Sequence, residues 1–193
     1  MINEKEIRIG FALCGSFCTF GRVIKVMSEL AEKGYSIVPI MSVAAATTDT
    51  RFGSAEYFRS AITGICGREP ICDIASAEPI GPKKLIDVLV VEPATGNTLA
   101  KLAAGIADGP VTLAVKSQLR NGRPIVIAVS TNDALGVNAK SIGMLASRKN
   151  VFFVPFGQDD PASKPCSAVA DFSRTEETVL AALEGKQLQP QLI

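Results

Sequence analysis

The sequence predicts an α/β fold, a three-layer doubly wound parallel sheet of the Rossmann-like or flavodoxin-like type. Short uninterrupted apolar runs, typical of buried strands, alternate along the chain with longer segments of helical periodicity. The segments between successive apolar runs are long enough for the crossover helices that parallel strands require. With 193 residues, of which 47% are hydrophobic and 20% charged, the chain can build one sizeable core. We therefore expect a single domain over residues 1–193.

The first half of the chain contains three apolar runs, two helical patterns and a turn-rich stretch. After the first run, apolar residues recur at three- and four-residue spacing until Gly34 stops the helix. In the second run, Pro39 lacks a ladder donor and indicates an edge strand or an irregularity in the strand. The third run is continuously apolar, so we expect it at the centre of the sheet. In chain order we expect a strand at 7–13, a helix at 19–33, a strand at 35–42, a helix at 54–63, turns at 71–82 and a strand at 87–93.

The second half continues the alternation and adds two strands. Helical spacing and short apolar runs follow one another as before, and the last residues are polar. We expect the polar tail, residues 185–193, to be loose. In chain order we expect helices at 98–106 and 111–120, a strand at 124–129, a helix at 138–148, a strand at 151–155 and a helix at 175–183.

Charge and composition exclude several classes of function. Lys and Arg number 20 against 19 for Asp and Glu, so on charge grounds we expect no nucleic-acid or anionic-membrane partner. Two acids precede the first apolar run and no long apolar run follows, so we expect no signal peptide or anchor and a cytoplasmic protein. The chain contains no histidine, which excludes Ser-His hydrolysis by Ser16 or Ser130 and makes a metal site improbable.

The cysteines are odd in number and irregularly spaced, as expected of reduced cytosolic thiols. Two of them flank the turn after the first strand, where a helix start lowers a thiol pKa. The alternative is that they are small packing residues, which is the commoner case. The five cysteines are Cys14, Cys18, Cys66, Cys72 and Cys166, of which the first two flank that turn.

In such a sheet, ligands bind at the carboxyl ends of the strands. The loop after the first strand, residues 14–21, has Gly15 and Ser16 between a strand and a helix start, which suits a phosphate. It matches neither GxGxxG nor GxxxxGK[ST], so the usual nucleotide fingerprints are missing. Helix capping by Ser16 or Thr19 is equally consistent with this spacing.

Two further loops carry polar groups at strand ends. Residues 44–53 hold three threonines, an Asp and an Arg, a set that suits a polar ligand or a solvated connection. Residues 92–101 run from a buried strand through Pro and small residues to Asn97 and Thr98 at a helix start. Small residues there allow a flat ring to approach. Capping of the helix by Thr95 or Asn97 is compatible with a binding role.

Residues 93–98, Pro-Ala-Thr-Gly-Asn-Thr, and the following residues 101–108 resemble the PASANT region of the homo-oligomeric flavin-containing cysteine decarboxylase superfamily. The similarity covers about residues 7–160, and the Gly15-Ser16 turn falls where that superfamily has its phosphate-binding turn. Within the superfamily, the chain resembles the small subunits of two-subunit synthases that form dipicolinate, pyridine-2,6-dicarboxylate. The stretches that carry this narrower resemblance are 15–20, 91–102, 128–133 and 154–161.

The resemblance implies a flavodoxin-type fold, trimers or assemblies of trimers, and FMN bound between neighbouring subunits. Carried over by position, the expected cofactor-binding residues are Gly15, Ser16, Phe17, Ser42, Ala94, Thr95, Asn97, Thr98, Ser130 and Thr131. The expected catalytic residues are Arg51, Asn97 and Asn132.

Two motifs depart from the superfamily pattern. Its decarboxylases use a histidine in the loop where this chain has Thr50-Arg51-Phe52. A guanidinium cannot act as a base at neutral pH, but it can clamp a carboxylate through two N–H bonds, so decarboxylation by the family mechanism is disfavoured. Of the family's PxMNxxMW motif, the chain retains only Asn132. A surface ion pair of Arg51 with Asp49 or Glu56 is an equally good interpretation.

The resemblance therefore implies a small synthase subunit that acts with the A subunit of the synthase, a partner that carries NADP. Together they would convert a dihydrodipicolinate-type precursor to dipicolinate in the mother cell of a sporulating bacterium, with this chain as a flavin-binding oxidoreductase subunit. Two alternatives stay open. One is a non-catalytic scaffolding or substrate-binding subunit, and the other is a stand-alone flavin-dependent decarboxylase or prenyl-flavin-type enzyme.

Overall fold

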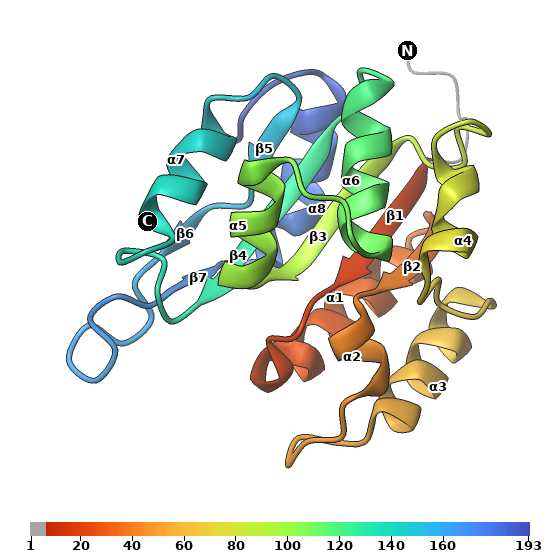
Figure 1. Ribbon diagram of the computed structural model, residues 1–193, viewed down its shortest axis with the longest axis horizontal. Coiled ribbons are helices and arrows are strands. Elements are labelled where there is room, and N and C mark those ends of the chain that lie inside the picture. Colours follow the sequence, from red (N-terminus) through yellow and green to blue (C-terminus); the bar gives the residue numbers. More distant parts are fainter. Residues whose placement is uncertain (1–6) are drawn as a thin grey trace.

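The computed structural model describes residues 7–193, which are built around a mixed sheet (Figure 1). Strands β2, β1, β3 and β4 lie side by side and are parallel, and β5 pairs in parallel with the first half of β4. Near the end of β4, β7 pairs antiparallel, and β6 pairs with β7. The strands are β1 (Arg8–Leu13), β2 (Ser36–Met41), β3 (Val88–Ala94), β4 (Ile125–Thr131), β5 (Val151–Phe153), β6 (Phe156–Gly157) and β7 (Ala168–Ala170).

Helices cover both faces of the sheet, as a doubly wound fold requires. On one face, α6 (Pro110–Arg120) contacts β2, β3 and β4, and α4 (Ile74–Ala77) and α5 (Gly96–Ala104) pack beside it. On the other face, α1 (Phe20–Glu32) and α8 (Thr175–Leu183) contact β3. The remaining elements are α2 (Val43–Thr47), α3 (Ala55–Cys66), α7 (Ala139–Ala146) and the short 3-10 turns η1 (Phe17–Thr19), η2 (Glu78–Ile80) and η3 (Phe172–Arg174).

The apolar runs form the strands because nearly every side chain on them is covered. All seven residues of β3 are buried, and so are five of the six in β1. This is the pattern expected of parallel strands with helices on both faces. β3 lies between β1 and β4, which confirms the prediction of a central strand. Pro39 lies in β2 at the edge of the sheet, where its missing N–H costs no ladder bond on the inner side.

Several predicted boundaries differ from the structure. The sheet is not wholly parallel, because β6 and β7 add antiparallel pairing. These strands have only two and three residues, which is too short to give a periodic pattern in the sequence. β4 runs on to Thr131 because its last residues pair with β7. The expected turn region at 71–82 contains α4 and η2 as well as turns.

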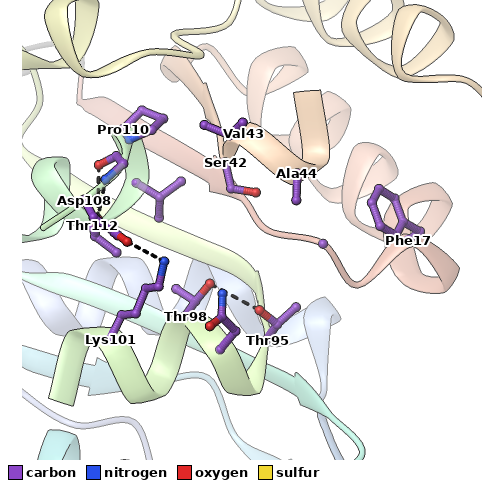
Figure 2. A pocket seen from close by; sticks show the side chains of 14 residues that line it. Phe17, Ser42, Val43, Ala44, Thr95, Thr98, Lys101, Asp108, Pro110 and Thr112 are labelled. Atoms are coloured by element: carbon purple, nitrogen blue, oxygen red, sulfur yellow. Dashed lines mark hydrogen bonds and ion pairs between the residues drawn. The ribbon is translucent and has the colours of Figure 1, made fainter. Parts of the chain in front are cut away.

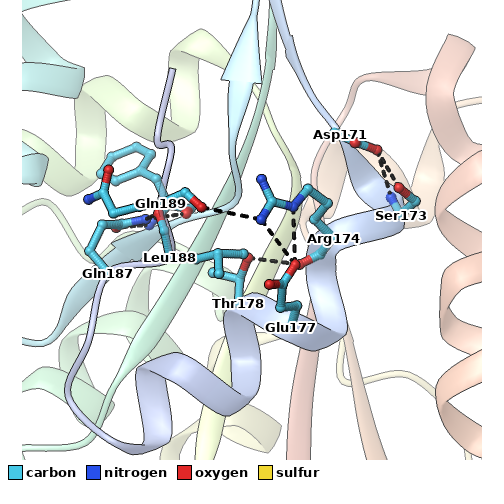
Figure 3. Close-up of polar contacts among 9 residues, drawn as sticks. Asp171, Ser173, Arg174, Glu177, Thr178, Gln187, Leu188 and Gln189 are labelled. Atoms are coloured by element: carbon cyan, nitrogen blue, oxygen red, sulfur yellow. Dashed lines mark hydrogen bonds and ion pairs between the residues drawn. The ribbon is translucent and has the colours of Figure 1, made fainter. Parts of the chain in front are cut away.

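The polar tail is held against the sheet, contrary to our expectation that residues 185–193 are loose. The Gln187 amide accepts a hydrogen bond from the Phe153 N–H at 2.8 Å and donates one to the Phe153 carbonyl at 2.7 Å. Arg174 donates to the Gln189 carbonyl (Figure 3). Phe156 forms a parallel bridge with Leu192. A tail that is polar in sequence can thus complete the backbone hydrogen bonding of a strand edge.

Among the described residues, no helix combines the length and the apolar character needed to cross a membrane. The two acids at the start of the chain, on which the expectation of no signal peptide rests, both lie in residues 1–6, outside the described residues.

Candidate functional site

Two pockets lie on either side of the turn that follows β1, at the carboxyl ends of the central strands. The first has a volume of about 470 Å³ and the second about 560 Å³, sizes that suit small-molecule ligands. Gly15, Phe17 and Thr95 line both pockets, so the turn after β1 and the end of β3 form the wall between them. A parallel sheet brings these segments together because its strands end at one edge.

The predicted site residues divide between the two pockets, except for one. Ala94 is completely buried at the end of β3 and lines neither pocket. Besides the shared residues, the first pocket contains Asn97, and also Ser42 and Thr98, which Figure 2 labels. The second contains Ser16, Arg51, Ser130, Thr131 and Asn132.

The hydroxyl groups at the starts of α1 and α5 are not helix caps. Thr19 precedes α1 and Thr95 precedes α5, but neither side chain makes a capping hydrogen bond. Ser16 likewise caps nothing, and Asn97 lies inside α5. Of the pocket residues proposed from sequence, Ser42 does cap a helix, accepting a bond from the Ala45 N–H at 3.2 Å. Capping therefore does not explain why hydroxyl residues stand before α1 and α5.

Two serines that are 114 positions apart in sequence meet in the second pocket. The Ser16 and Ser130 hydroxyls lie 2.9 Å apart and are hydrogen-bonded. Ser130 is buried at the end of β4, and Thr19 donates to the Ser16 carbonyl at 2.8 Å. These bonds fix the turn after β1 against β4, so the floor of the second pocket is formed by an ordered hydroxyl network.

A second polar network holds the loop after β4 against the start of α5. Asp133 accepts hydrogen bonds from Thr131 at 2.5 Å and from the Asn138 amide at 2.7 Å. These groups pack closely against Gly96, because a Cβ atom added there would lie 2.6 Å from both the Asn138 Nδ2 and the Asp133 Oδ1 atoms. The glycine in the middle of Pro-Ala-Thr-Gly-Asn-Thr is therefore needed for close packing, and Asn132 is held between two residues of this network.

The first pocket has a wall that the sequence did not reveal. Lys101 of α5 forms an ion pair with Asp108 at 2.6 Å, and this bond lowers the pKa of the Asp108 carboxyl. Figure 2 shows Lys101 reaching from α5 to Asp108, which lies just before α6, with Thr112 of α6 beside it. The Gly109-Pro110 pair before an apolar helical pattern was the available sequence signal. The first pocket is thus bounded by the first turns of two long helices, α5 and α6.

The second pocket is rich in cations. Besides the predicted Arg51, it contains Arg22 from α1 and Lys164 from the loop between β6 and β7, neither of which was predicted. Arg51 lies 4.9 Å above the Phe52 ring centroid. Within residues 7–193 it forms no ion pair with Asp49 or Glu56, so the surface-pair interpretation is wrong here. Arg51 thus lines the second pocket without a carboxylate partner among the described residues.

Two buried titratable groups, Cys14 and Glu92, lie in the strand-end region of the sheet but line neither pocket. Burial raises the pKa of the Cys14 thiol to about 11, against the smaller opposing effect of a hydrogen bond with Thr98. Cys14 is therefore a packing residue, and the interpretation of a thiol with lowered pKa is wrong for it. Burial also raises the pKa of Glu92 to about 8, although Thr175 donates to its carboxylate at 2.6 Å and the Arg22 charge acts in the opposite direction.

The residues of the first pocket fit a flavin mononucleotide. Gly15 and Ala44 leave space beside the strand ends for a flat ring, and Ser42, Asn97 and Thr98 supply donors for polar groups. The start of α5 adds uncapped backbone N–H groups, which favour an anion such as a phosphate. In residues 7–193 no cluster of three or more side chains has the composition of a metal site.

Comparison with known proteins shows which family the chain is similar to. The family model for Flavoprotein matches residues 2–181. The B subunit of dipicolinate synthase from Bacillus subtilis (strain 168) is 44% identical over 193 residues, covering 100% of this chain and 96% of the relative.

Solved structures agree with the sequence comparison. The B subunit of dipicolinate synthase from Bacillus halodurans C superposes with a TM-score of 0.89 at 44% identity, covering 100% of this chain and 98% of that one. DmrB of Burkholderia xenovorans, solved in complex with FMN, superposes with a TM-score of 0.70 at 17% identity, covering 94% and 98%. The similarity to DmrB concerns the fold alone, while the similarity to the Bacillus halodurans protein covers both sequence and fold.

Proposed function

The chain belongs to the Flavoprotein family, and from that membership we propose that it is the flavin-binding subunit of an enzyme that forms dipicolinate. The observation that carries the proposal is the pair of adjoining pockets. One is lined by small and hydroxyl-bearing residues that fit FMN, and the other, across the Gly15–Phe17 turn, is lined by cations that fit a carboxylate substrate. Their shared wall would keep cofactor and substrate next to each other.

Several of the predicted residues take a definite part in this proposal. In the first pocket Ser42 and one hydroxyl of the hydrogen-bonded Thr95–Thr98 pair would donate to the phosphate and ribityl chain, and Gly15 would let the ring approach. In the second, Arg51 would hold a carboxylate through two N–H bonds, and Asn132 would donate from the loop after β4. When bound, a flavin supplies the two-electron acceptor that conversion of a dihydropyridine to a pyridine requires.

The partners follow from the same proposal. Similarity to the B subunit of a synthase implies an A subunit, which we propose carries NADP and shares the chemistry in the mother cell of a sporulating bacterium. We also propose that copies of this chain assemble as trimers, or multiples of trimers, with the flavin between neighbours. Val43 supports this, because it lines the first pocket while 56% exposed. An apolar side chain so placed would be covered by a neighbouring copy.

The first test is to purify the chain and record its absorbance during size-exclusion chromatography with light scattering. We expect a peak with flavin bands and the mass of a trimer or a multiple of one. FMN is added to any colourless protein before it is scored. Protein that stays colourless but still activates the A subunit would instead support a scaffolding or substrate-binding role, and carbon dioxide release by the isolated chain would support the decarboxylase.

The second part of the test concerns Arg51. With the A subunit present, we expect Arg51→Ala to weaken apparent substrate affinity about tenfold or more, because it removes a charge-assisted bidentate contact. Arg68→Ala is the matched control, since Arg68 is an exposed cation that lines neither pocket. Equal kinetics of the two variants would show that Arg51 has no role in substrate binding.

A further inference from the structure

The second pocket concentrates positive charge in a chain that is nearly neutral. Arg22, Arg51 and Lys164 line it from three separate segments, and Asp159 is the one carboxylate among its lining residues. The pocket thus has an excess of two positive charges, while the whole chain has a formal net charge of +1. A pocket with this charge favours a dianion over a monoanion of the same size.

The two arginines are oriented but not neutralised by the protein. Arg22 stacks on the Phe172 ring, 4.8 Å from its centroid, as Arg51 does on Phe52. In the part of the chain that the structure describes, neither guanidinium forms an ion pair with a carboxylate. Stacking fixes the plane of a guanidinium and leaves its N–H edge available for a carboxylate.

The cations are divided between two sides of the pocket. Arg22 and Asp159 also line a neighbouring hollow beside β6 and β7, and Lys164 lies 3.5 Å from the Asp159 carboxylate. Arg51 does not line that hollow and belongs to the loop before α3. Two of the three cations, Arg22 and Lys164, therefore lie on the β6–β7 side together with Asp159 and Asp171, and Arg51 lies on the other side. A ligand with two separated carboxylates matches this division better than a single phosphate group.

We infer that Arg22 and Lys164 are specificity-determining residues that bind the second carboxylate of a planar dicarboxylate whose first carboxylate is held by Arg51. The inference rests on the proposed function and deepens it, because it says why a substrate with two carboxylates is selected over one with a single carboxylate. Between the two charged sides the pocket is lined by Ser16, whose hydroxyl is hydrogen-bonded to that of Ser130, and by Phe17, which offers an aromatic wall.

The test is calorimetric titration of the purified full chain in metal-free buffer. The probes are pyridine-2,6-dicarboxylate, pyridine-2-carboxylate and FMN. We expect Arg22→Met and Lys164→Met each to weaken binding of the dicarboxylate about tenfold or more, the usual effect of losing a charged hydrogen bond. The monocarboxylate should bind weakly to all forms and lose less than about threefold, because Arg51 remains for its one group. FMN affinity should not change.

Two further variants make the result specific. Lys25→Met changes the same charge on the same helix as Arg22, but Lys25 lies outside the pocket, so it should leave all three affinities unchanged. Arg22→Lys keeps the charge and should restore part of the dicarboxylate affinity. Met at position 22 keeps an apolar contact with Phe172, and a thermal unfolding curve checks that the variants are folded.

The possible outcomes separate this inference from the proposed function. If Arg22→Met and Lys164→Met weaken FMN rather than the dicarboxylate, these cations bind the flavin phosphate and the inference is wrong. It is also wrong if the dicarboxylate fails to bind, or binds equally to every variant. In contrast, a chain that never binds FMN but shows the expected dicarboxylate losses would contradict the flavin proposal and leave this inference standing.

Discussion

At the scale of single residues, Glu92 is the most unusual group in the core. It is fully buried in β3, Thr175 donates to one carboxyl oxygen, and the other oxygen, Oε1, has no hydrogen-bond partner. An ionised carboxylate in such a site carries a desolvation cost that one hydroxyl cannot offset, so its pKa rises to about 8. The carboxyl is therefore neutral in the folded protein at neutral pH, while the same group ionises in the unfolded chain.

This difference predicts a pH dependence of stability. The folded protein binds more protons than the unfolded chain between the ordinary value of 4.5 and the folded pKa of about 8. Stability from this group is therefore fully present below about pH 4.5 and is lost as pH rises toward 8, by up to about 1.4 kcal/mol per pH unit. We expect Glu92→Gln to remove this slope, as measured by urea unfolding at several pH values.

The control for this experiment is Glu56→Gln, because Glu56 is an exposed glutamate on α3. That variant should keep the wild-type slope between about pH 4.5 and 8. If Glu92→Gln also kept it, the carboxyl would be ionised in the folded protein and the desolvation argument would be wrong.

At the scale of elements, the start of α5 shows how a helix is placed by its neighbours. Gly96 is the first residue of α5, where alanine would normally favour the helix by up to about 1 kcal/mol. Here the added Cβ would meet two polar side chains at 2.6 Å. Overpacking of this kind costs about 1 to 3 kcal/mol, so the clash outweighs the helical gain. We expect Gly96→Ala to lower the free energy of unfolding and to weaken FMN binding, measured by denaturation and by fluorescence titration.

Gly143 provides a matched comparison within α7. An added Cβ there would meet nothing within 4 Å, so Gly143→Ala should stabilise the protein by up to about 1 kcal/mol and leave FMN affinity unchanged. Opposite signs for the two substitutions are the expected result. If Gly96→Ala were as stable as Gly143→Ala, the network of Thr131, Asp133 and Asn138 would have enough freedom to move, and it could not position the pocket wall.

The elements also show what the sequence could and could not predict. The helix expected at 175–183 matches α8, and the strand ends that carry Gly15, Thr95 and Ser130 were found because continuous apolar runs end where the chain leaves the core. Arg22 and Lys164 were missed for a physical reason. Arg22 lies on a helix whose orientation depends on packing, and Lys164 reaches the pocket only because β6 and β7 fold back onto β4. Such placement depends on contacts between distant segments.

At the scale of the whole molecule, the edge of the sheet at β5 has to be completed by another part of the chain. β5 pairs with β4 on one side. On the other side, the Gln187 amide forms hydrogen bonds with both the N–H and the carbonyl of Phe153. Phe153 is fully buried, so its N–H and carbonyl could not turn to water if that amide were lost. The tail thus connects the end of the chain to the same sheet that carries the pockets, as Figure 3 shows around Arg174 and Gln187.

We therefore expect Gln187→Ala to lower the free energy of unfolding by about 1 to 3 kcal/mol, the cost of leaving buried backbone groups unsatisfied. Gln189→Ala is the matched control, because Gln189 is exposed and uses its backbone carbonyl to bind Arg174. Chemical denaturation measures the free energy, and hydrogen exchange of the Phe153 amide measures the local effect. If both variants unfolded like the wild type and the Phe153 amide stayed protected, the tail would contribute nothing to the sheet, and the edge of β5 would be stable without it.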